Sequence, residues 1–276
     1  MRALPRPRSS LLRVVPSMVT LGNAVCGFAA ITLVIDAEAG AAGALRLSQA
    51  GLFLIAGMIL DAIDGGVARL LKQTSEFGAQ LDSLCDLVSF GVAPALMMMK
   101  FSQGLPPQLV WAGGLIYLLC VVSRLARYNV EHQNEFESRS WFRGLPSPAA
   151  AGTIASFLIA WPALTELATT TADPVWQASL TKFTDVGPLI LLWMTLALAF
   201  LMVSRIRYAH VVEQLRDRQR LMVHVLLLYV AILAFVAVSE LALPLVFVVY
   251  STTGPLRAVA WAATPIIVRQ IRPVLR

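Results

Sequence analysis

The sequence predicts an all-α protein that crosses a membrane several times. Of its 276 residues, 58% are hydrophobic and only 14% are charged, and the mean hydropathy is +0.72. A typical water-soluble domain is roughly 25% charged. The apolar residues also fall into runs of about 20, the length that a helix needs to cross a bilayer. Composition and run length together indicate a polytopic membrane protein.

The apolar runs follow one another with short polar connections, and each predicts one helix. In chain order the eight predicted spans are 17–35, 49–71, 79–99, 107–127, 148–168, 187–204, 222–239 and 241–262. The eighth contains two prolines, a glycine and an arginine, so a shorter helix with an interfacial segment is an alternative, and the range is seven or eight. The prolines of GLPSP favour an extended entry into the fifth span.

The basic residues are distributed unevenly between the two sides of this arrangement. Besides Arg257, whose side is ambiguous, only Arg46, Lys100 and Lys182 fall on the side opposite the termini. Cytoplasmic loops retain Lys and Arg, so we expect a cytoplasmic-membrane protein with both termini in the cytoplasm. The basic segment 1–16 lacks a typical cleavage pattern and is predicted to be an interfacial arm.

Several classes of function are not indicated. The net charge of +6 follows from topology and from attraction to membrane lipids, and no basic patch with interleaved aromatic residues suggests nucleic acid. Cys26, Cys85 and Cys120 lie singly inside apolar spans, which is typical of small core residues rather than of a disulfide or metal set.

Four aspartates stand out in the second and third spans. At about 100° per residue, Asp61 and Asp64 share one helix face, and Asp82 and Asp86 are spaced by four on the next helix. The connection between the two spans is very short, so the helices are antiparallel neighbours. Both acidic faces begin at the same, cytoplasmic end, and the four carboxylates can converge there.

Convergent carboxylates repel one another unless a cation lies among them. Two divalent cations would balance four aspartates, and a ligand set made only of oxygen atoms favours Mg²⁺ or Mn²⁺. A pair of such ions suits phosphoryl displacement. Glycines beside the aspartates suggest close approach of a nucleotide, and tight helix packing is the alternative explanation when the glycines are taken alone.

The acidic segment resembles the signature of a known family. Its eight fixed positions match the pattern D-x2-D-G-x2-A-R-x8-G-x3-D-x3-D of the CDP-alcohol phosphotransferases, membrane enzymes of phospholipid synthesis: Asp61, Asp64, Gly65, Ala68, Arg69, Gly78, Asp82 and Asp86. Flanking segments such as LDSLCDLVSFGVAPA and FRGLPSPAAAG are similar to the phosphatidylserine synthase branch of that family. The resemblance covers roughly residues 14–210.

The resemblance implies a fold, a site and a reaction. The fold is a six-helix core over 17–210, with about two further transmembrane helices in 211–276. Asp61, Asp64 and Asp82 would bind metal, and Asp86 would touch the second metal and act as the general base. Gly65, Ala68, Arg69 and Gly78 would bind the nucleotide. The implied substrates are CDP-diacylglycerol and L-serine, the released product is CMP, and the implied assembly is a homodimer.

Acceptor and phosphate contacts are less sharply indicated. The carboxylate of an amino-acid acceptor favours a guanidinium partner, and four arginines at cytoplasmic helix ends are candidates: Arg124, Arg127, Arg205 and Arg207. Each of these also suits anchoring at lipid headgroups. Thr20 and Asn23, one turn apart on the first span, are candidates for phosphate contacts or for interhelical hydrogen bonds.

Two alternative functions stay open at this point. Another acceptor, such as glycerol 3-phosphate, inositol phosphate or choline, would suit the same signature. A divalent-cation transporter would also carry intramembrane acids, although these acids cluster at one end of two helices with no second cluster in the other half of the membrane.

Overall fold

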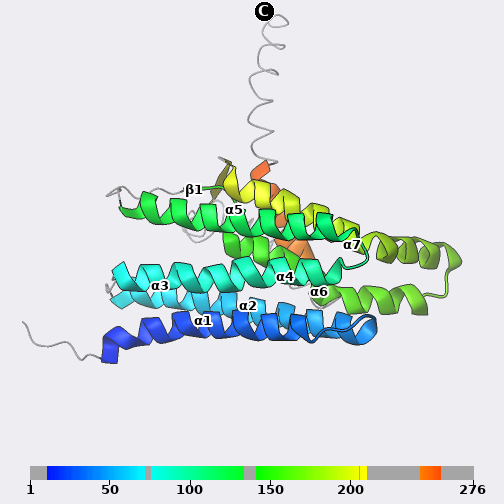
Figure 1. The fold of residues 1–276 in the computed structure, drawn as a ribbon, viewed down its shortest axis with the longest axis horizontal. Helices are drawn as coiled ribbons and strands as arrows, with labels where there is room; N and C mark the ends of the chain where they lie inside the picture. Colours follow the sequence, from blue (N-terminus) through cyan, green and yellow to red (C-terminus); the bar gives the residue numbers. More distant parts are fainter. Residues whose placement is uncertain (1–10, 72–75, 134–140, 205, 210–242, 256–276) are drawn as a thin grey trace, which may run out of the picture.

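The computed structural model describes every residue outside 1–10, 72–75, 134–140, 205, 210–242 and 256–276. Figure 1 shows long helices that lie side by side along one axis. In chain order they are α1 (Leu11–Ile35), α2 (Ala41–Leu71), α3 (Glu76–Asp86), the π-helical η1 (Leu87–Val92), α4 (Ala93–Phe101), α5 (Pro107–Gln133), α6 (Ser147–Thr170) and α7 (Pro174–Val203). Segments α3, η1 and α4 together form one span, Phe77–Phe101.

The described helices confirm the predicted all-α membrane fold. Six are long and apolar enough to cross a bilayer, and each overlaps one of the first six predicted spans. The second begins at Ala41 rather than at 49, and the sixth at Pro174 rather than at 187. The predicted seventh span, 222–239, lies outside the described residues. At the predicted eighth position the described residues include an apolar helix, Leu243–Pro255. The chain on both sides of it lies outside the described residues, so the choice between seven and eight spans stays a prediction. The predicted boundaries at 16 and 210 stay predictions, and α1 begins at Leu11.

Small residues bring the helices close together. α1 packs mainly on α2, α2 on α6, and α7 on both α5 and α6. At Gly51 an added Cβ would lie 2.9 Å from the Ala155 carbonyl oxygen of α6, and at Gly187 it would overlap the Trp161 ring. Close backbone approach of this kind is how membrane helices gain packing contacts without a hydrophobic driving force. The core therefore depends on glycine and alanine at the crossings.

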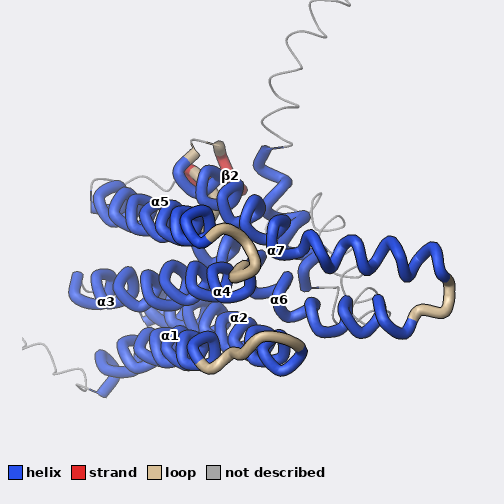
Figure 2. Tube along the Cα trace, turned by 45° about the vertical axis from the view of Figure 1, so that its right-hand side comes forward, coloured by secondary structure: helices blue, strands red, loops and turns tan. Residues whose placement is uncertain are grey.

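Two short strands join the end of α7 to the loop before α6. Strand β1 (Trp141–Arg143) pairs antiparallel with β2 (Arg207–Ala209), and the N–H of Gly144 donates to the Ile206 carbonyl oxygen at 2.8 Å. Gly144 has φ +83°, a conformation that favours glycine. Pro146 has ψ 139°, so the predicted extended entry into α6 is confirmed. The strands therefore tie the end of α7 to the chain just before α6, and Figure 2 shows them (red) above α5.

The start of α7 differs from the sequence prediction. The polar stretch 169–186 was predicted to be a connection between two spans. In the structure α7 begins at Pro174, so residues 174–186 of this stretch are helical. The Asp173 side chain accepts a hydrogen bond from the Val175 N–H at 2.8 Å, and proline follows at the first helical position. Both features favour helix initiation, and exposed polar side chains do not oppose it.

Candidate functional site

Three aspartates from two neighbouring helices meet at one end of the bundle. Asp61 and Asp64 lie in the last turns of α2 and Asp82 lies in α3. The end of α2 and the start of α3 are at the left in Figure 1. One carboxylate oxygen from each lies within 4.8 Å of the other two. Asp64 is buried, whereas Asp61 and Asp82 are half-buried. The structure therefore places three acids of the signature in one compact cluster.

Asp86 lies beside this cluster and has its own partner. It is the last residue of α3 and is 8% exposed. The Asn23 side chain donates from Nδ2 to Asp86 Oδ1 at 3.1 Å. Asp86 interacts electrostatically with Asp61 and Asp82, but it is not one of the three acids whose oxygens gather within 4.8 Å in the described part of the chain. The fourth acid is thus adjacent to the group of three and held separately.

Helix α1 supplies neutral hydrogen-bond donors to two of the carboxylates. The Thr20 hydroxyl donates to Asp64 Oδ2 at 2.6 Å, and Asn23 donates to Asp86. The two donors are three residues apart, so they share one face of α1. The structure thus gives both residues interhelical hydrogen bonds, one of the two predicted roles, and their contact with phosphates stays a prediction.

The donor set of the cluster fits a divalent cation. All its ligand atoms are carboxylate oxygens, and Asp82 Oδ1 is buried with no hydrogen-bond partner among the described residues. Buried carboxylates this close together repel one another, and an unpartnered buried oxygen is costly. A hard cation such as Mg²⁺ or Mn²⁺ removes both penalties. The acidic cluster can therefore bind metal.

The predicted nucleotide-binding residues border the cluster along the chain. Gly65, Ala68 and Arg69 continue the helical backbone of α2 beyond Asp64, and their side chains lie outside the described part. Gly78 is half-buried in the first turns of α3, one turn before Asp82. Their contacts with a nucleotide stay predictions.

The predicted acceptor-binding arginines have different environments. Arg124, on α5, donates from Nη1 to the Ser147 hydroxyl at 2.7 Å and interacts electrostatically with Asp61 and Asp86. Arg127 donates to the Val203 carbonyl oxygen at the end of α7, at 3.4 Å. Arg205 lies outside the described residues, and Arg207 lies in β2, where only its backbone is described. Two of the four candidates, Arg124 and Arg127, have described guanidinium groups, and that of Arg124 interacts with the acids.

Sequence reasoning missed three polar residues around the site. The Ser89 hydroxyl donates to the Asn23 carbonyl oxygen at 2.9 Å, and the Tyr117 hydroxyl donates to the Phe90 carbonyl oxygen at 3.0 Å. Ser147 holds Arg124. All three are fully buried. For Ser89 and Tyr117 the available signal was a polar group within an apolar span, and Ser147 directly precedes one, but this signal does not say which partner the residue meets.

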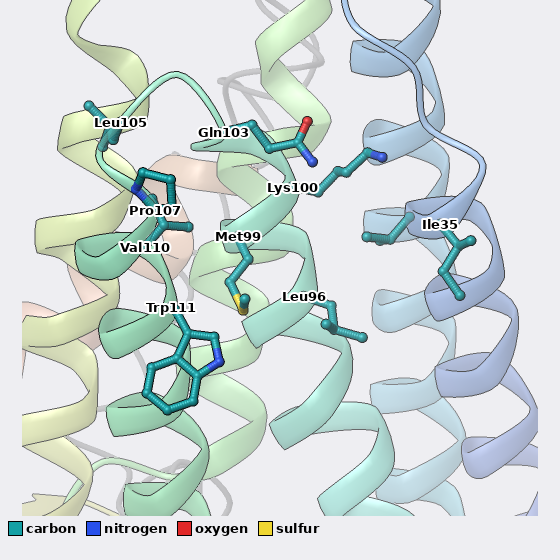
Figure 3. Close-up of a pocket in the computed structure, with 10 residues that line it drawn as sticks. Ile35, Leu96, Met99, Lys100, Gln103, Leu105, Pro107, Val110 and Trp111 are labelled. Carbon is teal, nitrogen blue, oxygen red and sulfur yellow. The ribbon is translucent and has the colours of Figure 1, made fainter.

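A groove of about 590 Å³ lies at the other end of the bundle (Figure 3). Its walls come from the last turn of α1, from α4 and from the start of α5, and include Ile35, Met99 and Trp111. Lys100 and Gln103 are polar residues among mostly apolar ones. Among the described residues the lining of the groove contains no acid, and it shares no residue with the aspartate cluster.

Fold and site together define a multi-pass membrane protein with a carboxylate cluster that can bind metal at one end of its helices. Comparison with known families agrees with this class. The chain belongs to the CDP-alcohol phosphatidyltransferase family, whose family model matches residues 13–201. Members of this family use divalent cations.

Curated relatives narrow the comparison within the family. A CDP-diacylglycerol–serine O-phosphatidyltransferase of Mycobacterium tuberculosis is 37% identical over 163 residues, which are 56% of this chain and 52% of the relative. One of Bacillus subtilis is 30% identical over 199 residues, 72% of this chain and 92% of the relative. An archaetidylserine synthase of Methanothermobacter thermautotrophicus is 34% identical over 146 residues, 52% of this chain and 57% of the relative. The matched segment spans about half the length of the mycobacterial relative.

Proposed function

We propose that this chain transfers the phosphatidyl group of CDP-diacylglycerol to the hydroxyl of L-serine and releases CMP. The observation that carries the proposal is the meeting of Asp61, Asp64 and Asp82, with oxygens within 4.8 Å, in a chain of this family. The names of the three relatives above all contain serine, either as a substrate or in the name of the lipid product, whereas the lipids that they name differ. Serine is therefore the acceptor that the comparisons favour.

The cluster is the proposed metal site. Divalent cations held by Asp61, Asp64 and Asp82, two if Asp86 contributes, would neutralise the charge of the diphosphate and of the leaving CMP. Gly65, Ala68, Arg69 and Gly78 are the proposed nucleotide contacts. Because the acids lie at the end of two membrane helices, the acyl chains can stay among lipids while CMP exchanges with water.

Asp86 is the proposed general base. It takes the proton of the serine hydroxyl as the hydroxyl oxygen forms a bond to the phosphatidyl phosphorus. The bond between that phosphorus and the CMP oxygen breaks, and CMP leaves with the electron pair. The transfer needs no covalent enzyme intermediate. The position of Asp86 beside the three clustered acids, held by Asn23 at 3.1 Å, supports this division of roles.

Arg124 is the first candidate for the serine carboxylate. Its guanidinium interacts with Asp86, and its Nη1 donates to the Ser147 hydroxyl. The remaining N–H groups of a guanidinium can pair with a carboxylate in a forked geometry. Arg127, Arg205 and Arg207 are further candidates, and Thr20 and Asn23 are proposed to lie near the CDP phosphates.

The proposed assembly is a homodimer in the cytoplasmic membrane, with the site on the cytoplasmic side.

A CMP-release assay tests the acceptor. The purified protein is given CDP-diacylglycerol and Mg²⁺ or Mn²⁺ with L-serine, glycerol 3-phosphate, inositol phosphate or choline in separate reactions. We expect L-serine to stimulate CMP release, and Asp86→Asn to abolish the stimulation. If another acceptor stimulates release and L-serine does not, the serine assignment is wrong although the reaction class stands.

A further inference from the structure

A π-helical segment interrupts the third span directly after Asp86. In η1 the N–H of Ala93 bonds to the carbonyl oxygen of Val88, five residues earlier, so the turn contains one more residue than an α-helical turn. The flanking segments α3 and α4 are α-helical and continue the same span. Single π turns inside α-helices cost stability and occur frequently at functional sites. The position of η1 next to Asp86 therefore needs an explanation.

The π turn places Ser89 against α1. Ser89 donates from Oγ to the backbone carbonyl oxygen of Asn23 at 2.9 Å, and Asn23 donates from Nδ2 to Asp86 Oδ1 at 3.1 Å. Ser89 and Asn23 are both fully buried. Two hydrogen bonds therefore connect α1 to the third span on either side of the junction between Asp86 and η1.

Helix α2 packs against the side-chain amide of Asn23 at Gly57. A Cβ added at Gly57 would lie 2.9 Å from Asn23 Oδ1, and Oδ1 is buried without a hydrogen-bond partner among the described residues. If the amide were flipped, Oδ1 would face the Asp86 carboxylate, and two acceptors would meet. The amide is thus confined to the orientation in which it donates to Asp86.

Helix α5 holds the other side of the π turn. The Tyr117 hydroxyl, which is fully buried, donates to the Phe90 carbonyl oxygen at 3.0 Å. A carbonyl group in an irregular turn is a weaker intrahelical acceptor and benefits from an outside donor. Contacts from α1 and α5 therefore fix η1 on two sides.

We propose that Asn23 and Ser89 are positioning residues that, together with η1 and the space left by Gly57, fix the direction of the Asp86 carboxylate. The inference rests on the proposed function, in which Asp86 takes the proton of the acceptor. A base held by buried hydrogen bonds keeps its geometry while the acceptor enters, and small errors in placement cost rate. The π turn is then the backbone part of the catalytic site.

Two substitutions disturb the arrangement by different routes. Ser89→Ala removes the bond to the α1 backbone, and Gly57→Ala places a methyl group against Asn23 Oδ1, so that the amide must shift from its present position. For each we expect kcat to fall about 10-fold while the KM for CDP-diacylglycerol and for the acceptor stay within about twofold. A loss of folded protein would lower the active fraction in proportion to the folded fraction, which thermal unfolding and size-exclusion chromatography measure.

Matched controls come from the same helices. Ser102 is a fully buried serine at the far end of the same span and donates to the Pro188 carbonyl oxygen at 3.1 Å. Gly22 faces α2, where its added Cβ would meet only the flexible Leu60 Cδ1, at 3.3 Å. Ser102→Ala and Gly22→Ala should keep kcat within about twofold of the unsubstituted chain. An equal fall in kcat for the controls, or none for Ser89→Ala and Gly57→Ala, would overturn the inference.

A structural readout separates this inference from the choice of reaction. All variants are assayed with every acceptor of the panel, so a different preferred acceptor changes the proposed function but not the ratio between variant and unsubstituted chain. If no acceptor supports CMP release, the proposed function fails. A structure of the Gly57→Ala protein then decides: a rotated Asp86 carboxylate supports the positioning role, and an unmoved one refutes it.

Discussion

At the scale of single residues, the four carboxylates differ in the partners they have. Asp64 and Asp86 each accept a hydrogen bond from a neutral donor on α1, whereas Asp82 Oδ1 is buried without a partner among the described residues. A neutral donor offsets part of the cost of burying a carboxylate and leaves its charge in place. Asp82 therefore has an oxygen atom available for a cation.

Asp82→Asn should remove metal binding and activity together. The substitution keeps the shape of the side chain but removes one negative charge and one anionic ligand from the cluster. We expect Mn²⁺ affinity, measured by electron paramagnetic resonance, and CMP release each to fall by at least about 100-fold. Asp185→Asn, at an exposed position of α7, is the control and should change neither. Full activity of the Asp82 variant in chelator-treated membranes would contradict the metal site.

Thr20→Val tests the shortest hydrogen bond of the site. Valine has nearly the same shape as threonine but cannot donate to Asp64 Oδ2, which Thr20 contacts at 2.6 Å. A hydrogen bond to a charged group contributes about 1.5–3 kcal/mol. We expect a loss of that size in the free energy of unfolding without metal. Saturating Mg²⁺ should reduce the loss, because the ion then neutralises Asp64. An equal loss with and without Mg²⁺ would argue against an ion beside Asp64.

Sequence reasoning located the acids but not their supports. Helix periodicity and a short connection predict that Asp61, Asp64 and Asp82 meet, and both of these features are local in sequence. The bond from Ser89 to α1 depends on η1, an irregularity of the backbone that no residue type specifies. The orientation of the Asn23 amide depends on Gly57, on a different helix. Contacts that need two or three helices at once cannot be derived from one-dimensional patterns.

At the scale of elements, the connection between β1 and α6 depends on one glycine. Gly144 has φ +83°, and a Cβ there would overlap the Met202 carbonyl oxygen at the end of α7. Gly144→Ala should therefore lower the free energy of unfolding by about 1–3 kcal/mol. Gly104, in the loop between α4 and α5, has no atom within 4 Å of its added Cβ, and Gly104→Ala should be neutral. Equal thermal midpoints for the two variants would contradict the strained turn.

The helix Leu243–Pro255 packs on α6, outside the segment that the family model matches. The hydroxyl groups of Ser251 and Thr153 lie 3.0 Å apart, and a Cβ at Gly152 would overlap the Phe247 ring. In a chain whose native cysteines are replaced, Thr153→Cys with Ser251→Cys should form an intramolecular disulfide on mild oxidation. Thr153→Cys with Thr252→Cys, at an exposed position, should not. Equal cross-linking of both pairs would show that the helix is not held in this register.

Element boundaries were harder to predict than element types. The six spans were predicted because bilayer crossing demands long apolar runs, which a sequence displays directly. The first half of α7 was read as a connection because its residues are polar, although Asp173 followed by Pro174 is a helix-start signal. Polarity reports where a residue meets water, and it does not report whether the backbone is helical.

At the scale of the whole molecule, the distribution of basic residues predicts which end faces the cytoplasm. The aspartate cluster lies at the end of the bundle that also holds the end of α5, and the loop between α4 and α5 lies at the opposite end. In a chain whose native cysteines are replaced, Gly104→Cys should react with a membrane-impermeant maleimide in intact cells. Val130→Cys, at a position 59% exposed, should react only after permeabilisation. The reverse pattern would invert the proposed topology.

The hairpin of α6 and α7 extends beyond the turns that join the other helices (Figures 1 and 2). α7 has 30 residues, about 45 Å of helix against a hydrocarbon core of about 30 Å. Val175 and Trp176, in its first turn, are 74% and 65% exposed. An antibody fragment raised against this tip would bind a helical hairpin that is longer than the hydrocarbon core is thick, and it would give this small protein the fiducial mark that particle alignment in electron microscopy requires.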